Sequence, residues 1–119
     1  MIVLLSPAKT LDYSPTKTSA TAAPIFRKES KALIDVLRKH SSKDIQKLMK
    51  VSEKIADLNV ERYKDYSTRF SKKNSKASLL AFDGDVYKGL NAQEFNASQI
   101  KFAQAHVRIL SGLYGMLRP

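Results

Sequence analysis

A short, uninterrupted apolar run near the N-terminus, Ile2-Val3-Leu4-Leu5, places the strongest constraint on the fold. Its β-branched and leucine side chains predict a strand over residues 2–6, which Pro7 ends. A continuous apolar run is more typical of a strand buried on both faces than of an edge strand. The chain is therefore expected to build a sheet that other elements cover.

The rest of the chain predicts helices and two further strands around that first strand. Residues 10–24, rich in Ser, Thr, Ala and Pro, are expected to form an extended surface loop. Ser41 or Ser42 is expected to cap one helix, and another helix is expected to begin near Ser52. The predicted helices cover residues 27–39, 42–49, 52–66 and 86–90 and begin again near Ser98, and the other predicted strands cover residues 79–82 and 106–110.

This order predicts an α/β fold, with a mixed or parallel sheet and a helical, basic insertion between the first and second strands. Residues 1–119 are expected to form a single α/β unit. The chain has no cysteine and only two histidines, His40 and His106, which argues against disulfides, thiol catalysis and a histidine-rich metal site. We expect no cofactor and no bound metal. The absence of a membrane-spanning apolar segment favours a cytoplasmic protein with no membrane partner.

The positive charge is concentrated in the middle of the sequence. The chain has 21 Lys and Arg against 11 Asp and Glu, and residues 26–76 hold 15 of the basic and 7 of the acidic residues. A cationic segment attracts polyanions, because neutralising phosphates releases condensed counterions. The alternative is a solvated lysine surface that serves solubility and binds nothing.

Two groups of residues are candidates for contacts with double-stranded DNA. Lys43, Lys47 and Lys50 recur at helical spacing and would lie within about 60° of one another, which is also typical of the solvated back of an amphipathic helix. Residues 86–106 have the outline of a helix-hairpin-helix, a unit that binds the DNA backbone without reading sequence, although many helical hairpins share this outline. Lys88, Gly89 and Lys101 lie in this segment, and Arg108, just beyond it, is a further candidate.

A different hypothesis is an enzyme that acts on a small anionic substrate. If the three strands were parallel neighbours, their carboxyl ends would bring together Lys9, Asp83, Asp85 and Tyr114. Such a set suits acid–base chemistry or anion binding. Asp83-Gly84-Asp85 is equally well explained as turn chemistry, and without an activated nucleophile or a metal triad we expect binding rather than catalysis.

Four long segments of the sequence together resemble the peroxide stress protein YaaA family. They are IVLLSPAKTLD from Ile2, LMKVSEKIADLN from Leu48, FDGDVYKGL from Phe82 and FAQAHVRILSGLYGMLRP from Phe102. The resemblance implies a bacterial, cytoplasmic protein that protects against hydrogen peroxide by limiting free iron and the resulting oxidative damage to DNA. It also implies DNA binding through a helix-hairpin-helix and a basic cleft within an unusual α/β fold.

Family members continue beyond the Leu117-Arg118-Pro119 element for about as long again. The resemblance therefore implies that this chain corresponds to the N-terminal half of a larger single domain. In that case apolar surface would be exposed, and we expect possible self-association through it.

Overall fold

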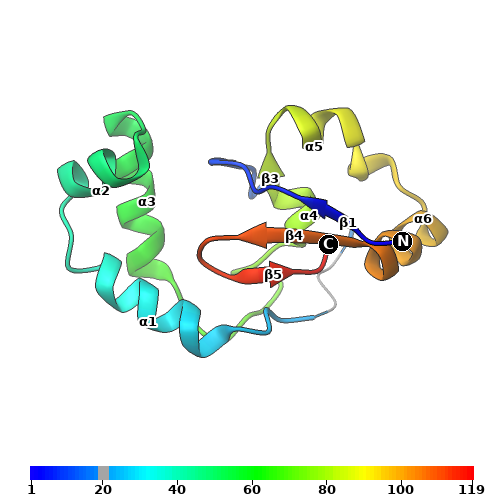
Figure 1. Cartoon of the computed structure of the whole chain (residues 1–119), viewed down its shortest axis with the longest axis horizontal. Coiled ribbons are helices and arrows are strands. Elements are labelled where there is room, and N and C mark those ends of the chain that lie inside the picture. The colour runs from blue at the N-terminus through cyan, green and yellow to red at the C-terminus, as the bar shows by residue number, and fades with distance from the viewer. Residues whose placement is uncertain (19–21) are drawn as a thin grey trace. The chain divides into compact units, whose positions relative to one another are not determined.

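The computed structural model describes residues 1–18 and 22–119. The chain divides into two compact units, one made of residues 1–26 and 70–119 and the other of residues 27–69. The first unit contains the strands, and the second is the predicted helical, basic insertion (Figure 1). Within the described ranges, every helix is too short or too polar to cross a bilayer.

The first unit contains a three-stranded mixed sheet in the order β1-β4-β5. Its strands are β1 (Val3–Leu5), β4 (Val107–Ser111) and β5 (Gly115–Leu117). β1 runs parallel to β4, with Leu5 opposite Ile109, and β5 returns antiparallel to β4, with Ile109 opposite Leu117. The predicted α/β class and mixed sheet are therefore confirmed, whereas β5 was not predicted.

The predicted strand over residues 79–82 is wrong. Ser78–Ala81 form a helical turn, α4, and only Phe82–Asp83 are extended, as β3. This strand pairs antiparallel with β2 (Thr10–Leu11) in a separate two-stranded sheet, so the three predicted strands are not parallel neighbours. A short apolar run fits a buried helical turn as well as a strand, and here Leu79 and Ala81 are buried from the helical turn.

The predicted loop over residues 10–24 is also corrected at its start, because Thr10 and Leu11 form β2. Residues 19–21 of that loop lie outside the described residues.

The core of the first unit lies between the sheet and the segment that precedes β4. This segment comprises α5 (Asp85–Leu90), the 3₁₀ helix η1 (Ala92–Glu94) and α6 (Ala97–His106). Asn96 caps α6, since its side chain accepts from the Gln99 backbone N–H while the Gln99 side chain accepts from the Asn96 N–H. The buried core consists of Leu79, Tyr87, Ala92, Ala103, Ile109 and Leu117.

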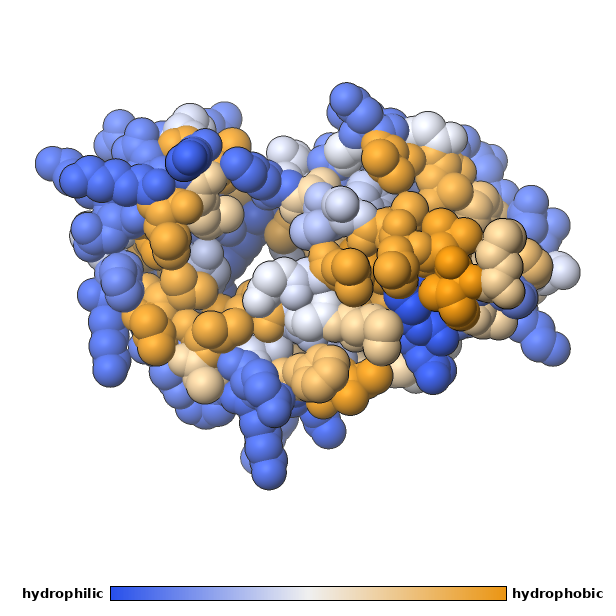
Figure 2. Space-filling model, in the orientation of Figure 1, coloured by the Kyte–Doolittle hydropathy of each residue, from blue (hydrophilic) through white to orange (hydrophobic). Residues whose placement is uncertain are grey.

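The opposite face of the sheet is apolar and exposed. Side chains alternate along a strand, so Leu4, Leu110 and Met116 lie on the face away from Ile109. Their exposed fractions are 59%, 48% and 40%. Figure 2 shows apolar side chains gathered over the sheet on the face turned to the viewer. A parallel strand pair is ordinarily covered on both faces, and this one is covered on one.

The second unit contains three helices around a small core. They are α1 (Arg27–Leu37), α2 (Ser42–Met49) and α3 (Glu53–Asp65), and α2 packs along α3. Ser41 caps α2 as predicted, and Ser52 caps α3, which was expected to begin near it. Ile34, Ile45 and Ala56 are almost fully buried, one from each helix. The helical spacing of these apolar residues explains why the sequence forms helices here.

Arg38, just past the end of α1, joins that helix to the C-terminal end of α3. Its Nε donates to the Tyr63 carbonyl at 2.7 Å, and its Nη2 donates to the carbonyls of Lys64 at 3.3 Å and Tyr66 at 2.8 Å. The last carbonyls of a helix have no partner within the helix and carry partial negative charge. One guanidinium therefore satisfies carbonyls that the helix leaves open and fixes α1 against α3.

Candidate functional site

The predicted lysine row lies on α2 and at its end. Lys43, Lys47 and Lys50 are all exposed, and none of them forms an ion pair within the described residues. Lys50 closes the helix in the left-handed conformation, with φ 52°. Lys43 and Lys47 are one helical turn apart, so their ammonium groups lie on one side of α2.

The acidic residues close to this row are engaged by serines. The Asp44 carboxylate accepts from the Ser41 backbone N–H at 3.0 Å and from its hydroxyl at 2.8 Å, completing a capping box. Asp57, on α3, accepts a hydrogen bond from the Ser42 hydroxyl. Hydrogen bonds from the Ser41 side chain, then its backbone, lower the pKa of Asp44. These carboxylates cap a helix and bridge two helices; after the Ser41 hydrogen bonds, Lys47 contributes to the lowered pKa of Asp44 through its charge but forms no ion pair with it within the described residues.

The structure also shows which lysines of the basic segment are engaged. Lys31 pairs with Asp35 at 2.5 Å and Lys64 with Glu61 at 3.2 Å. Lys76 is an internal residue of the first unit, with 7% of its side chain exposed and its Nζ bonded to the Asp12 carbonyl at 2.8 Å. Part of the charge surplus in residues 26–76 is therefore used in internal contacts, whereas Lys43, Lys47 and Lys50 remain exposed and without an ion pair within the described residues.

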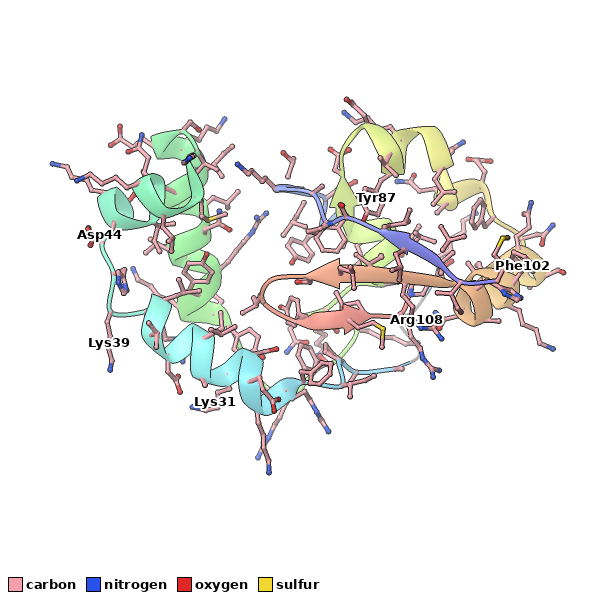
Figure 3. All side chains as sticks on the ribbon, in the orientation of Figure 1. Lys31, Lys39, Asp44, Tyr87, Phe102 and Arg108 are labelled. Atoms are coloured by element: carbon pink, nitrogen blue, oxygen red, sulfur yellow. The ribbon has the colours of Figure 1, made fainter. Side chains whose placement is uncertain are left out.

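The hairpin candidates and Arg108 lie in the first unit, on three different elements. Lys88 and Gly89 are exposed on the short helix α5, and Lys101 is exposed on α6. Lys88 lies 3.7 Å from Asp83. Arg108 is half-buried in β4, where its Nη1 donates to the carbonyls of Gln104 and Val107 (Figure 3). Its hydrogen-bonding capacity is partly used inside the protein, whereas Lys88 and Lys101 face solvent.

The residues of the enzyme hypothesis are only partly brought together. Thr10 lies opposite Asp83 in the β2–β3 pair, so Lys9 directly precedes the partner of Asp83. Asp85 is exposed in the first turn of α5. Tyr114 lies in the turn between β4 and β5, where its backbone N–H donates to the Ser111 hydroxyl. That turn belongs to the three-stranded sheet and Asp83 to the two-stranded sheet, so the strand ends do not meet as parallel neighbours in one sheet. The loop after β1 nevertheless reaches the 83–85 turn, where a Cβ on Gly84 would lie 3.2 Å from Ala8.

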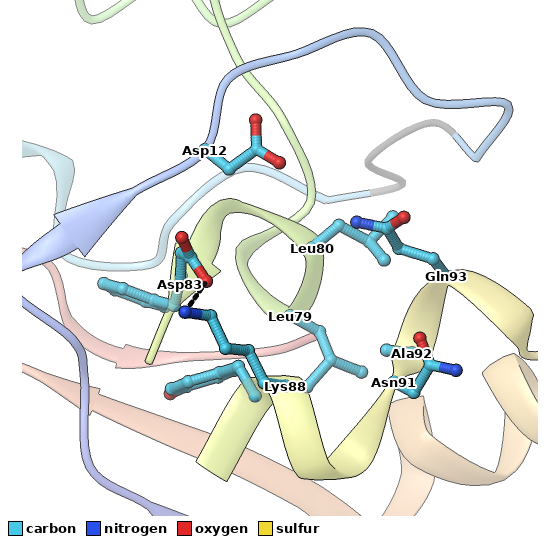
Figure 4. Close-up of a pocket in the computed structure, with 10 residues that line it drawn as sticks. Asp12, Leu79, Leu80, Asp83, Lys88, Asn91, Ala92 and Gln93 are labelled. Carbon is cyan, nitrogen blue, oxygen red and sulfur yellow. Dashed lines mark ion pairs between the residues drawn. The ribbon is translucent and has the colours of Figure 1, made fainter. Parts of the chain in front are cut away.

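A pocket of about 210 Å³ lies beside Asp83 (Figure 4). Its lining combines apolar side chains with charged and amide groups. The residues are Asp12, Leu79, Leu80, Phe82, Asp83, Tyr87, Lys88, Asn91, Ala92 and Gln93. Sequence reasoning missed Asp12, Asn91 and Gln93 here, because the pocket depends on the β2–β3 pairing and on the αL turn at Asn91, with φ 50°.

Tyr87 holds one wall of this pocket in place. Its ring packs against Phe82 with centroids 5.5 Å apart, and its hydroxyl donates to the Ser6 carbonyl at 2.5 Å. Burial raises the pKa of Tyr87, so the neutral hydroxyl persists at physiological pH. Figure 3 shows this side chain between α5 and β1. Tyr87 therefore fixes α5, and with it Lys88, against the first strand.

No group of three or more His, Asp and Glu side chains that suits a metal ion is found in residues 1–18 and 22–119.

The fold and the site define an α/β protein in which a basic three-helix unit interrupts a sheet-containing unit. The chain belongs to the peroxide stress protein YaaA family, whose model matches residues 1–119. It is 51% identical to a UPF0246 protein of Janthinobacterium sp. (strain Marseille) and 53% identical to one of Ralstonia pickettii (strain 12J). Both matches cover all of this chain, but only 46% and 47% of those proteins. The chain thus spans about half the length of the curated relatives it matches.

Proposed function

We propose that this protein binds double-stranded DNA in the response to hydrogen peroxide and limits iron-dependent oxidative damage to that DNA. Membership of the peroxide stress family supports the stress role. Binding is largely independent of sequence, because the basic side chains that support it are suited to phosphate oxygens rather than base edges.

The observation that carries the proposal is the row of Lys43, Lys47 and Lys50 on α2. Its side chains are exposed and without ion pairs among the described residues, and Lys43 and Lys47 are one helical turn apart. The neighbouring carboxylates of Asp44 and Asp57 accept hydrogen bonds from serines instead. A phosphate that approaches α2 therefore meets ammonium groups that need not first be released from an internal partner.

A second contact is proposed at the helical hairpin of the first unit, through Lys88, Gly89 and Lys101. Gly89 has open space around its Cα, so a DNA backbone can approach α5 closely there. The turn between α5 and α6 is a 3₁₀ helix, and Asn96 begins α6. This contact, like the first, is to phosphate and gives no sequence preference.

A salt titration of duplex DNA binding tests the proposal. Affinity should fall steeply with salt, with a log–log slope of roughly −0.9 for each phosphate contact. Replacing Lys43 and Lys47 by Gln should make the slope less negative by about 1.8, since two contacts are lost. The control variant replaces Lys72 and Lys73, which removes the same charge from a loop outside α2. No binding at low salt, or equal effects of the two variants, would overturn the proposal.

The alternative is an enzyme that acts on a small anionic substrate beside Asp83 and Lys88. One feature of the pocket favours this alternative, because the Lys88 ammonium group lies at the cavity and could bind an anion. Two carboxylates, Asp12 and Asp83, line the same cavity and oppose an anion there. Separate replacement of Lys9 and Asp83 distinguishes the two functions, because lost peroxide protection with intact DNA binding favours the enzyme.

A further inference from the structure

The pocket beside β3 has the size and lining of a site for one small heterocycle. Its volume of about 210 Å³ lies below the roughly 300–1,000 Å³ typical of pockets for drug-sized ligands. Leu79, Leu80 and Ala92 supply apolar surface, and the Phe82 and Tyr87 rings form a wall. These groups suit a flat ring that packs one face against the aromatic wall and keeps its other face and one edge in contact with water.

The polar groups of the pocket can pair with the edge of such a ring. Asp12 Oδ1 accepts from the Ser14 backbone N–H at 2.8 Å, and an ionised carboxylate has further lone pairs that can accept from a ligand. Hydrogen bonds from the Ser14 side chain and then its backbone lower the pKa of Asp12, so this acceptor is ionised at neutral pH. Within the described residues, the side-chain amides of Asn91 and Gln93 have no hydrogen-bond partner. Figure 4 shows Asp12 and Gln93 among the side chains that line the pocket, on two separate segments of the chain.

The position of Asp12 is set by backbone and side-chain bonds that are independent of any ligand. Its N–H donates to the Ala81 carbonyl at 2.7 Å, and its own carbonyl accepts from Lys76 Nζ at 2.8 Å. A carboxylate held in this way is preorganised to accept hydrogen bonds. Carboxylates accept from the amino group of cytosine, and carboxamides pair with the amino and ring-nitrogen edge of adenine.

We propose that this pocket binds an amino-bearing nucleobase that is unpaired in DNA, and that it rejects thymine. The inference rests on the proposed DNA-binding function and adds a preference for distorted DNA. Thymine lacks the amino group, and its one ring N–H is flanked by two carbonyl oxygens that the Asp12 carboxylate repels. Lys88, which is 68% exposed and only 3.7 Å from Asp83, can turn from that carboxylate to the phosphate beside the bound base.

The experiment compares two bulged duplexes that differ in one base. The chain is titrated into labelled DNA with a single bulged dC, the same DNA with a bulged dT, and the fully paired duplex, at one salt concentration. The dC bulge should bind roughly fivefold or more tightly than the dT bulge. Asp12→Asn and Gln93→Leu should each reduce this ratio, whereas the Lys43 and Lys47 double substitution should weaken both complexes and leave the ratio unchanged.

Free nucleotides complete the test, because an unpaired base in DNA and the base of a free nucleotide present the same hydrogen-bonding groups to the pocket. Binding of deoxycytidine 5′-monophosphate and of thymidine 5′-monophosphate is followed by calorimetry. Selective binding of the first without any binding of DNA would retain the pocket and overturn the proposed function. DNA binding with equal affinity for the dC and dT bulges would overturn the pocket assignment and leave the proposed function standing. Circular dichroism verifies that Asp12→Asn folds. Gln93→Leu changes an exposed side chain, so it tests the pocket independently of any effect of Asp12→Asn on folding.

Discussion

The ammonium group of Lys76 donates a hydrogen bond to the backbone carbonyl of Asp12 at 2.8 Å, across 64 residues of sequence. The same ammonium lies 3.9 Å from the Asp12 carboxylate. The two residues join the segment after β2 to the segment before α4, and so fix one rim of the pocket. Lys76 therefore contributes to the internal structure of the first unit, although its position in the sequence places it in the basic segment of residues 26–76.

Replacing Lys76 by Met should destabilise the protein by about 1–3 kcal/mol, because the Asp12 carbonyl loses its partner in a largely buried place. Chemical denaturation measures the loss. The same substitution at the exposed Lys73 is the matched control and should change stability by less than about 0.5 kcal/mol. Equal effects at the two positions would show that the buried hydrogen bond is not the cause.

Replacing Arg38 by Ala should destabilise the three-helix unit by about 1–3 kcal/mol, because three carbonyls at the end of α3 lose their donor. Arg38→Lys should recover only part of this, since an ammonium does not reproduce the planar fork of a guanidinium. Hydrogen exchange of the amides in the last turn of α3 measures the effect. Lys39→Ala is the control on the adjacent position, and exchange that is unchanged in Arg38→Ala would refute the prediction.

Gly115→Ala should destabilise the first unit, and Gly89→Ala should not. Gly115 has φ +71°, and a Cβ added there would lie 2.7 Å from Phe26 Cδ2. We expect a loss of roughly 1–3 kcal/mol from the strained backbone and the displaced ring. Gly89 lies in α5 with open space around it, so alanine there should raise stability by up to about 1 kcal/mol. Thermal denaturation of the two variants tests this prediction. A fall of the same size in the melting temperature of both would contradict it.

The capping box of α2 should make stability depend on pH in the acid range. The pKa of Asp44 lies below the ordinary aspartate value of 3.8 in the folded chain. Its contribution to folding is therefore complete above that value and is lost as the pH falls from there through the folded-state pKa. Asp44→Asn should thus be less stable than the parent chain near neutral pH, and the difference should shrink at acid pH. Because Asp12 and Asp35 shift in the same direction, only the difference between the two proteins is diagnostic. A difference that does not vary with pH would exclude the carboxylate as its source.

The exposed face of the sheet should promote self-association of this chain. Leu110→Lys places a charge in the middle of the apolar face and should lower the associated fraction in sedimentation velocity. Val86→Lys, an exposed apolar residue on α5 rather than on the sheet, is the control. A parent chain that sediments as a monomer at all concentrations would refute this expectation.

The helices of the second unit were predictable because local signals agree with the tertiary structure there. Ile34 and Ile45 follow the helical period, and Ser41 and Ser52 are strong N-caps. By contrast, Leu79 and Leu80 have no period that separates a strand from a helical turn, and only packing against Tyr87 and Ala92 decides. The short strand β5 depends on Gly115 turning the chain back, a conformation that sequence permits but does not require.

The candidate site could be predicted only where it is local. Lys43 and Lys47 are one turn apart on a single helix, so their proximity follows from helical geometry. The pocket joins Asp12 to Asn91 and Gln93 through strand pairing and an αL turn, and no spacing rule connects residues so far apart. Lys76 was counted as a surface charge for the same reason, because its burial depends on a partner 64 residues away.

The parallel pairing of β1 with β4 has a consequence for how the chain folds during synthesis. Val3 to Leu5 are synthesised about a hundred residues before their partners, Val107 to Ile109. At translation rates of roughly 5–20 residues per second, this is an interval of about 5–20 s. The three helices of residues 27–69 make mostly short-range contacts and can form within that time. The first strand, the most apolar segment of the chain, is exposed throughout it and is the segment on which we expect a chaperone to act.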